Sequence, residues 1–221
     1  MPTRPRTLAY CITKRAIDIL GSLIGLCLLA PLIAALAAAI RISTGGPAFF
    51  GQVRTGRDGR PFRVFKLRSM TGPPSFEVGR ETSAEDPRIT PIGAWLRRTG
   101  CDELPQLVNV LRGEMSLVGP RPLLAWENDL CDDRQARRLL VRPGITGLAQ
   151  VNGRNSIAWE DRIAWDIRYV DGASLGIDLV ILFRTLPVAL LGLDAYYSPR
   201  RPALSTLQDG RWERWGIEGE A

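Results

Sequence analysis

The chain has 221 residues and a net charge of +6, with four cysteines and no histidine. This length suits one domain, or one domain with an appendage, and the basic balance favours an anionic partner such as a nucleotide, nucleic acid or anionic lipid. Without histidine, acid–base, nucleophilic and metal-binding roles fall to other side chains, and we expect carboxylates to fill them. The cysteines form no C-x-x-C pair, which argues against a zinc site and a disulfide framework.

The first predicted element is a membrane helix. No charged residue occurs from Ile19 to Ile40, a run long enough to cross a bilayer as a helix. Pro31 lies in the middle of this run and predicts a kink. Basic residues flank the run on both sides, so the positive-inside rule gives no direction for a crossing. Two arrangements stay open: a spanning helix, or a re-entrant helix that breaks at Pro31 and returns to the same leaflet, with Asp18 near the headgroups and paired with Lys14 or Arg15.

A β-hairpin is predicted after the membrane helix. Asp58-Gly59 separates two partly alternating stretches, as is typical of a hairpin turn. In the second arm, residues 62–68, apolar residues alternate with basic ones such as Arg63 and Lys66. One face should therefore pack, while the other presents cations either to solvent or to a phosphate.

The central elements place two acidic residues at the start of a helix. Residues 71–88 have a loop composition, and residues 91–98 predict a short helix that stops at Gly100. Asp102 and Glu103 follow, directly before an apolar stripe with helical spacing. The stripe consists of Leu104, Leu107, Val108 and Leu111, and Gly113 closes the helix.

The second half of the chain alternates rigid turns with short predicted elements. The turn over residues 116–122 should hold Arg121 in a fixed place. We expect a charged helix over 132–140, a rigid turn over 141–147, a strand-like stretch over 148–151, a helix with core-facing residues over 159–170 and an interfacial amphipathic segment over 175–193. The residues from 198 onward are polar and give no prediction of order.

The carboxylate pair allows two interpretations. Asp102 can be a helix N-cap, which is a common structural use of aspartate, with Glu103 a first-turn acid of no special role. Alternatively, the pair beside Arg97 and Arg98 forms a phosphoryl transfer site, because carboxylates can attack phosphorus and a helix start attracts anions. A divalent ion held by Glu103 would then relieve the repulsion between Asp102 and an incoming phosphate.

Three blocks of the sequence resemble the signature of a known family. They read FKLRSM, DPRITPIGAWLRRTGCDELPQLVNVLRGEMSLVGPRPLL and VRPGITGLAQVNGR. In this order they are similar to the blocks of the bacterial sugar transferase family, the monotopic phosphoglycosyl transferases that act on polyprenol phosphate, in their minimal form. The resemblance extends from about residue 14 to residue 190. Ala30 and Cys101 depart from it, since the family often has serine and leucine at these positions.

The resemblance implies an activity and residues that carry it. The enzyme would transfer a sugar 1-phosphate from a nucleotide diphosphate sugar, usually a UDP-sugar, to undecaprenyl phosphate and release the nucleoside monophosphate in ping-pong order. Asp102 corresponds to the nucleophile and Glu103 to the ligand of Mg²⁺. The phosphate- and substrate-binding residues would be Lys66, Arg97, Arg121, Arg142 and Arg154. Which sugar is transferred is not readable from the sequence.

The resemblance also implies a fold and a location. We expect a mostly helical α+β protein at the cytoplasmic face of the bacterial inner membrane, monotopic and in contact with membrane lipid. Residues 1–43 would form the N-terminal tail and a re-entrant helix-break-helix hairpin broken at Pro31. Residues 44–197 would form a small catalytic domain with a β-hairpin and interfacial amphipathic helices, and residues 198–221 a polar tail. The oligomeric state stays open, with a dimer as one alternative.

A membrane-tethered binding or scaffold protein is the alternative from another class. It would use the basic surface on anionic lipid or nucleic acid, without any dependence on Asp102 or Mg²⁺. Nucleic acid is not the expected partner, because the basic residues are scattered among rigid turns and form no known reader motif.

Overall fold

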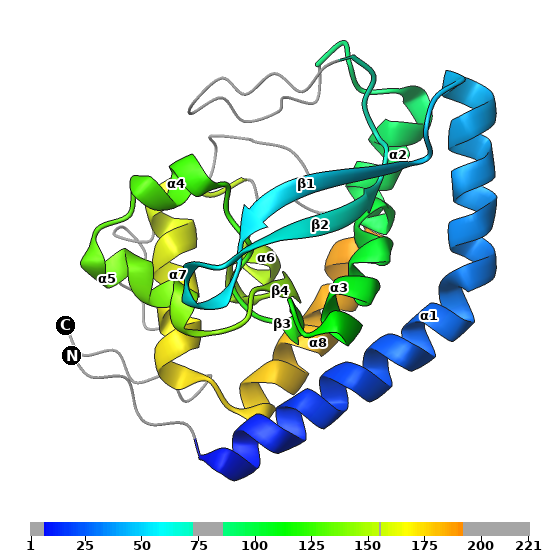
Figure 1. Cartoon of the computed structure of the whole chain (residues 1–221). Helices are drawn as coiled ribbons and strands as arrows, with labels where there is room; N and C mark the ends of the chain where they lie inside the picture. Colours follow the sequence, from blue (N-terminus) through cyan, green and yellow to red (C-terminus); the bar gives the residue numbers. More distant parts are fainter. Residues whose placement is uncertain (1–6, 73–85, 155, 192–221) are drawn as a thin grey trace.

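The computed structural model describes residues 7–72, 86–154 and 156–191. Part of the predicted loop over 71–88 and the whole predicted tail over 198–221 lie outside these residues. The described chain is mostly helical with two small sheets, which confirms the α+β class (Figure 1). Its helices are α1 (Leu8–Thr44), α2 (Pro91–Thr99), α3 (Leu107–Arg112), α4 (Ala125–Asp129), α5 (Asp133–Ala136), α6 (Leu148–Val151), α7 (Trp159–Gly172) and α8 (Leu175–Leu190). The 3-10 turns are η1 (Arg57–Gly59), η2 (Cys101–Gln106) and η3 (Arg137–Leu140), and the strands are β1 (Phe49–Thr55), β2 (Pro61–Leu67), β3 (Ser116–Val118) and β4 (Gly144–Thr146).

Helix α1 is long, apolar and bent. It has 37 residues and is the one helix of the described chain that is long and apolar enough to cross a membrane. Figure 1 shows that α1 changes direction part-way along its length, and its single internal proline is Pro31. A proline removes one backbone donor and clashes with the preceding turn, so we attribute the bend to Pro31. The kink predicted at Pro31 is confirmed, but the chain stays helical through this residue, so α1 is one bent helix where the family resemblance implied two helices separated by a break.

The N-terminal half of α1 packs on the domain through small and polar residues. A Cβ on Gly21 would lie 2.8 Å from Leu117 Cδ1, so α1 approaches the domain closely here and a larger residue would displace the end of the Leu117 side chain. Asp18 is buried and accepts hydrogen bonds from Ser116 Oγ and Leu117 N, both at 2.9 Å. The predicted pairing of Asp18 with Lys14 or Arg15 is therefore wrong. The backbone of β3 offers buried donors that need an acceptor, and Asp18 supplies it.

The C-terminal half of α1 packs on the same domain. Ile40 is fully buried in a cluster with Leu67 of β2 and Leu96 of α2. Ile33 and Leu36 of α1 pack against this cluster. Both halves of the bent helix thus contact one domain, as Figure 1 shows for α1 along its lower and right-hand sides.

The two sheets are small, and the sequence predicted only one of them. β1 and β2 pair antiparallel, from Phe49 opposite Leu67 to Thr55 opposite Pro61, and the turn between them uses the left-handed region at Asp58 (φ 56°) and Gly59 (φ 77°). The predicted hairpin is confirmed. β3 and β4 pair in parallel inside segments that were predicted as rigid turns. Residues 148–151 form helix α6 rather than a strand, because a short apolar run has no period that distinguishes the two.

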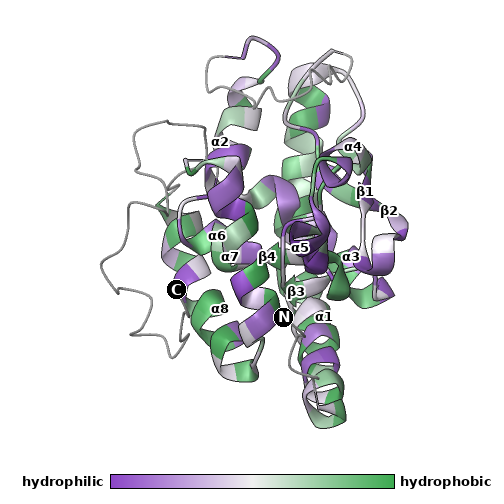
Figure 2. Cartoon of the chain, turned by 90° about the vertical axis from the view of Figure 1, so that its left-hand side faces the viewer, coloured by the Kyte–Doolittle hydropathy of each residue, from purple (hydrophilic) through white to green (hydrophobic). Residues whose placement is uncertain are grey.

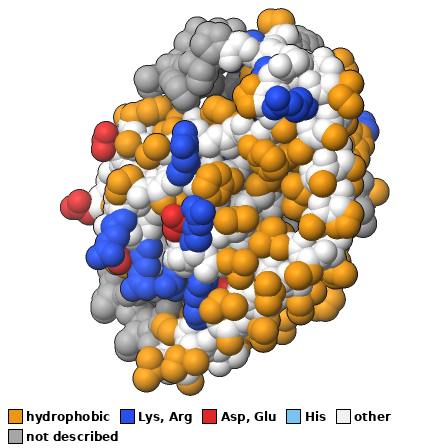
Figure 3. Space-filling model, turned by 45° about the vertical axis from the view of Figure 1, so that its right-hand side comes forward, with side chains coloured by type: hydrophobic (Ala, Val, Ile, Leu, Met, Phe, Trp, Pro, Cys, Tyr) orange, Lys and Arg blue, Asp and Glu red, His pale blue; other side chains and the backbone are white. Residues whose placement is uncertain are grey.

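The apolar surface is concentrated on α1 and α8. Figure 2 shows hydrophobic residues along much of both helices. The large exposed hydrophobic side chains include Leu20, Leu23, Ile24 and Leu28 of α1 and Leu179, Phe183 and Leu186 of α8. In Figure 3 hydrophobic side chains form a broad surface with Lys and Arg side chains along its border. Contiguous apolar surface of this kind marks a membrane or protein contact.

Candidate active site

The carboxylate pair lies in a 3-10 turn between two helices. Gly100 ends α2 with a φ of 74°, and the chain passes directly into η2 and then α3. Asp102 and Glu103 are each 8% exposed, and the Glu103 backbone N–H donates to Gly100 O at 3.0 Å. The interpretation of Asp102 as a helix N-cap is wrong, since Gly100 occupies the cap position and Asp102 is inside the turn. Its carboxylate is therefore free for another role.

Glu103 is held by two cations. Lys66 Nζ lies 2.7 Å from Glu103 Oε1, and Arg121 Nη2 lies 2.8 Å from the same oxygen. Burial alone would raise the pKa of Glu103, but Arg121 and Lys66 outweigh it and hold this pKa well below its usual value. Burial also lowers the pKa of Lys66, in opposition to its pairing with Glu103. The pair of cations thus keeps Glu103 ionised.

The side chain of Asp102, unlike that of Glu103, is not held by a cation of the described chain. Among the described residues, no hydrogen bond or ion pair holds its side chain. Burial raises its pKa, the nearby Lys66 opposes this, and the charge of Glu103 adds to the rise. The environment therefore separates the pKa values of two adjacent carboxylates, which is typical of sites where they have separate roles.

The structure brings four of the five predicted basic residues to this turn. Besides Lys66 and Arg121, the charge of Arg97 acts on Asp102 and lowers its pKa, while Arg97 Nη1 donates to Met70 Sδ at 3.2 Å. Arg154 Nη2 would lie 3.9 Å from a Cβ on Gly100. Arg142 lies elsewhere: its Nε donates to Gly113 O at 2.8 Å, at the opposite end of α3.

Two further arginines support the segment that carries Arg121. Arg54 donates to Gln52 Oε1 at 2.7 Å and to Pro122 O at 3.3 Å, and forms an ion pair with Glu127 at 3.4 Å. Burial, followed by the charge of Arg121, lowers the pKa of Arg54 to about 10. The sequence analysis missed this residue. Its signal was the spacing of Gln52 and Arg54, which places both on one face of β1.

Arg138 supports the same segment from the other side. It is 3% exposed, forms an ion pair with Asp166 at 2.6 Å and donates to the carbonyl oxygen of Arg121. The sequence offered no signal for it beyond a basic residue in a charged helix. Arg121 is therefore fixed through its backbone as well as through Glu103.

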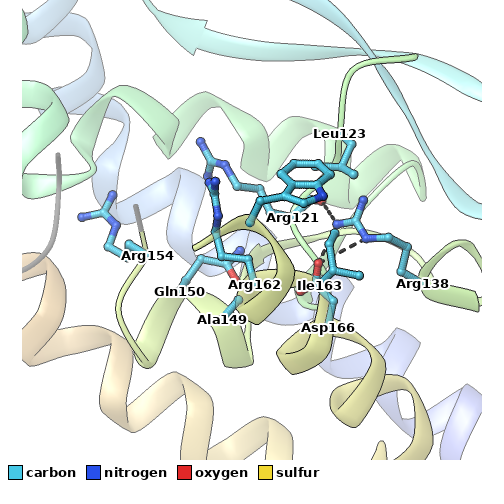
Figure 4. Close-up of a pocket in the computed structure, with 10 residues that line it drawn as sticks. Arg121, Leu123, Arg138, Ala149, Gln150, Arg154, Arg162, Ile163 and Asp166 are labelled. Atoms are coloured by element: carbon cyan, nitrogen blue, oxygen red, sulfur yellow. Dashed lines mark hydrogen bonds and ion pairs between the residues drawn. The ribbon is translucent and has the colours of Figure 1, made fainter. Parts of the chain in front are cut away.

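A pocket shares Arg121 with the site of the carboxylate pair, and Figure 4 shows the residues that line this pocket. It lies between α6, α7 and the loop after β3, and Arg121 belongs both to its wall and to the ion pair with Glu103. The lining residues are Arg121, Leu123, Arg138, Ala149, Gln150, Arg154, Trp159, Arg162, Ile163 and Asp166. Four arginines in one wall suit an anionic ligand.

The carboxylates of the turn fit a magnesium ion that is bound partly by the protein and partly by the substrate. Within the described residues, no group of three or more His, Cys, Asp or Glu side chains forms a metal cage. Mg²⁺ is usually bound by one or two carboxylates together with substrate phosphates, rather than by an all-protein cage. Glu103, now paired with Lys66 and Arg121, offers one such carboxylate, so the residues fit an ion that arrives with a phosphorylated substrate and not one held by the protein alone.

Comparison with known proteins identifies relatives over most of the chain. Residues 9–192 match the family described as bacterial sugar transferase. The exopolysaccharide production protein ExoY of Rhizobium meliloti is 40% identical over 200 residues, which cover 84% of this chain and 88% of that protein. The uncharacterized sugar transferase EpsL of Bacillus subtilis is 43% identical over 180 residues, 81% of this chain and 88% of that protein.

A longer relative carries a more specific name. The UDP-glucose:undecaprenyl-phosphate glucose-1-phosphate transferase of Escherichia coli is 38% identical over 198 residues, which cover 84% of this chain but 42% of that protein.

Proposed function

Because the chain belongs to the bacterial sugar transferase family, we propose that it transfers a sugar 1-phosphate from a UDP-sugar to undecaprenyl phosphate and releases UMP. The chain is a phosphoglycosyl transferase, and its relatives serve polysaccharide synthesis. The proposed step commits one sugar to a lipid carrier.

The difference between the two carboxylates is the observation that carries this proposal. Glu103 is bound by two cations, whereas Asp102 is buried beside Lys66 and Arg97 with no partner of its own among the described residues. We propose that an Asp102 oxygen attacks the phosphorus that bears the sugar. The bond from this phosphorus to the UMP oxygen breaks, UMP leaves, and the sugar phosphate stays on Asp102.

The acceptor then completes the reaction. A phosphate oxygen of undecaprenyl phosphate attacks the same phosphorus, the bond to Asp102 breaks, and the product is undecaprenyl diphosphate sugar. Lys66, Arg97 and Arg121 surround the pair and would offset the charge on the transferred phosphoryl group in both steps. Their placement around a buried carboxylate supports this role.

Glu103 is the proposed protein ligand of Mg²⁺, together with the diphosphate of the substrate. A bound Mg²⁺ would neutralise phosphate charge near the ionised Asp102. Glu103 suits this role because Arg121 and Lys66 keep its pKa low, so that it is ionised when the substrate arrives.

We further propose that α1 is re-entrant and that the protein is monotopic at the cytoplasmic face of the inner membrane. The contacts of α1 support this topology, because Asp18 in its first half and Ile40 in its second half pack on the same domain. A helix that crossed the bilayer would carry one of these halves away from that domain. The exposed apolar residues near the bend would lie in the lipid.

Cysteine labelling tests the topology. Cys11, near the start of α1, is exposed, and so is Ser43 near its end. One variant keeps Cys11 alone, and a second carries Ser43→Cys with all native cysteines replaced by serine. A membrane-impermeant reagent should label both in inside-out vesicles and neither in intact cells. Labelling of the two positions from opposite sides would establish a spanning helix.

Isotope exchange tests the chemistry. Membranes with the wild-type protein should incorporate labelled UMP into UDP-sugar before any lipid acceptor is added, since the first half-reaction is reversible. Asp102→Asn should abolish this exchange, whereas Asp133→Asn, on the exposed surface of α5, should leave it unchanged. Full exchange in Asp102→Asn would rule out Asp102 as the nucleophile.

A further inference from the structure

The pocket between α6, α7 and the loop after β3 adjoins the carboxylate pair through two shared arginines. Arg121 lines the pocket and binds Glu103 at 2.8 Å. Arg154 lines it too, and its guanidinium lies beside Gly100, the residue at the start of the turn that carries Asp102. A ligand bound in this pocket would therefore lie next to the turn that carries Asp102.

The wall of this pocket holds polar atoms without partners. Gln150 is 9% exposed, and neither its amide oxygen nor its amide nitrogen has a hydrogen-bond partner among the described residues. Asp166 binds Arg138 through one carboxylate oxygen, while its other oxygen, Oδ1, is likewise without a partner in the described chain. Leaving a buried polar atom unpaired costs about 1–3 kcal/mol, so such atoms call for an explanation. A ligand that pairs with them provides one.

On the basis of the proposed function, we propose that this pocket binds the nucleoside part of the UDP-sugar and that Gln150 pairs with the edge of the uracil base. A primary amide presents one acceptor and one donor side by side. Uracil presents the complementary pair, an N3–H donor next to a carbonyl acceptor. Two hydrogen bonds can therefore form at once.

The other pocket residues suit the rest of a nucleotide. Trp159 offers an aromatic surface, with the Arg162 guanidinium 5.6 Å from its ring centre. Asp166 Oδ1, which is buried without a partner among the described residues, would accept a hydrogen bond from a ribose hydroxyl. Arg121 lines the pocket (Figure 4) and also binds Glu103, so it would contact the diphosphate between the nucleoside and Asp102. The pocket thus supplies a chemically matched group for the base, the ribose and the phosphates.

A blocked base tests the pairing without any change to the protein. Binding of UDP and of 3-methyl-UDP, which lacks the N3–H donor, would be measured by calorimetry on the full-length wild-type protein in detergent with Mg²⁺. A site that pairs with this donor should bind UDP at least about tenfold more tightly, because the methylated analogue leaves a buried acceptor unpaired. Equal affinity for the two nucleotides would overturn the proposal.

Variants then assign the effect to Gln150. Gln150→Ala should bind UDP about tenfold more weakly and lose its preference over 3-methyl-UDP, while its affinity for 3-methyl-UDP stays near that of the wild type. Retention of the preference would overturn the role of Gln150. The same measurements on Arg162→Gln and Arg168→Gln give a matched pair. Both arginines stack on a tryptophan of α7, but only Arg162 lines the pocket, so only its loss should weaken UDP binding.

These binding measurements are independent of the chemical step. UDP binding needs no attack by Asp102, so a failure of the pairing would leave UMP exchange and its dependence on Asp102 intact. Conversely, if Asp102 were not the nucleophile, the protein would still bind UDP more tightly than 3-methyl-UDP.

Discussion

Two buried charged clusters in this protein are built in opposite ways. The junction cluster consists of Tyr10, Lys14, Tyr169 and Asp178, and joins α1 to α7 and α8. Lys14 Nζ lies 2.8 Å from Asp178 Oδ2 and 3.1 Å from Val118 O, and Tyr169 donates to Asp178 Oδ1 at 2.8 Å. Each carboxylate oxygen of this cluster has a partner.

The site cluster consists of Lys66, Asp102, Glu103 and Arg121. Glu103 is satisfied as fully as Asp178, but Asp102 is buried next to it without a partner among the described residues. A saturated buried network fixes a conformation, whereas a buried charged group left unsaturated costs stability and remains available to a substrate. The comparison therefore separates a structural cluster from a reactive one, and the predictions below test this separation.

The largest expected effect is that of Asp102→Asn on activity. UMP exchange should fall by at least about a thousandfold, because the attacking oxygen is lost. Stability should not fall. Since burial raises the pKa of Asp102 above its usual 3.8, the folded protein holds this proton more tightly than the unfolded chain does, and ionisation at neutral pH destabilises the fold. Thermal unfolding at pH 7 should show an unchanged or higher Tm, and a clearly lower Tm would contradict the prediction.

Glu103→Gln should be the most destabilising change in the site cluster. It leaves Lys66 and Arg121 without a counter-charge, at a cost of about 3 kcal/mol in the free energy of unfolding. The pKa of Glu103 is lowered in the folded state, so its stabilising effect is present above its usual value of 4.5 and disappears as the pH falls through the lower folded value. Denaturant unfolding at several pH values should show the two proteins converging in acid. A constant difference across this range would refute the assignment.

Asp178→Asn should destabilise the protein by about 2 kcal/mol, because Lys14 loses its charged partner in the junction cluster. UMP exchange per folded molecule should be retained, as this cluster does not contact the carboxylate pair. Asp171→Asn is the matched control: Asp171 pairs with Arg137, but its side chain is 46% exposed, so its loss should change stability by less than about 0.5 kcal/mol. Equal losses of stability in the two variants would contradict the structural role of the junction cluster.

The smallest effect is expected for Arg54→Gln. This residue positions the Arg121 segment through Pro122 O and Glu127, so exchange should slow by about tenfold, mainly through kcat. Arg54→Lys should restore part of the rate by keeping the ion pair with Glu127. An unchanged kcat in Arg54→Gln would mean that Glu103 and Arg138 suffice to place Arg121.

The sequence was most informative where a local pattern or a set of adjacent residues carries the structure. Asp58-Gly59 predicted the hairpin. Lys66 and Arg121, which are far from the carboxylate pair in the chain, were assigned to its site by the family resemblance and not by a local pattern. The parallel pair of β3 and β4 was missed, because three-residue strands show no alternation.

Hydrogen bonds between residues that are distant in the sequence could not be predicted either. Asp18 accepts from β3, and Arg142 binds Gly113, neither of which a local pattern could indicate. The stripe of Lys14, Asp18, Gly21 and Gly25 in an otherwise apolar helix was available as a signal. Small and polar residues on one side of a membrane helix mark the side that meets protein, and this is the side on which Gly21 and Gly25 approach Leu117 and Leu107.

Arg15 of α1 has a consequence for how the enzyme meets its lipid substrate. It donates to Val110 O at 2.7 Å and to Leu111 O at 2.9 Å, and so binds the end of α3, the helix that follows the turn with Asp102 and Glu103. In the proposed re-entrant topology, the depth of α1 in the bilayer would therefore set the height of the carboxylate pair above it. This topology predicts that the rate depends on bilayer thickness, because vesicles with shorter or longer acyl chains would shift the carboxylate pair relative to the plane of the lipid phosphates.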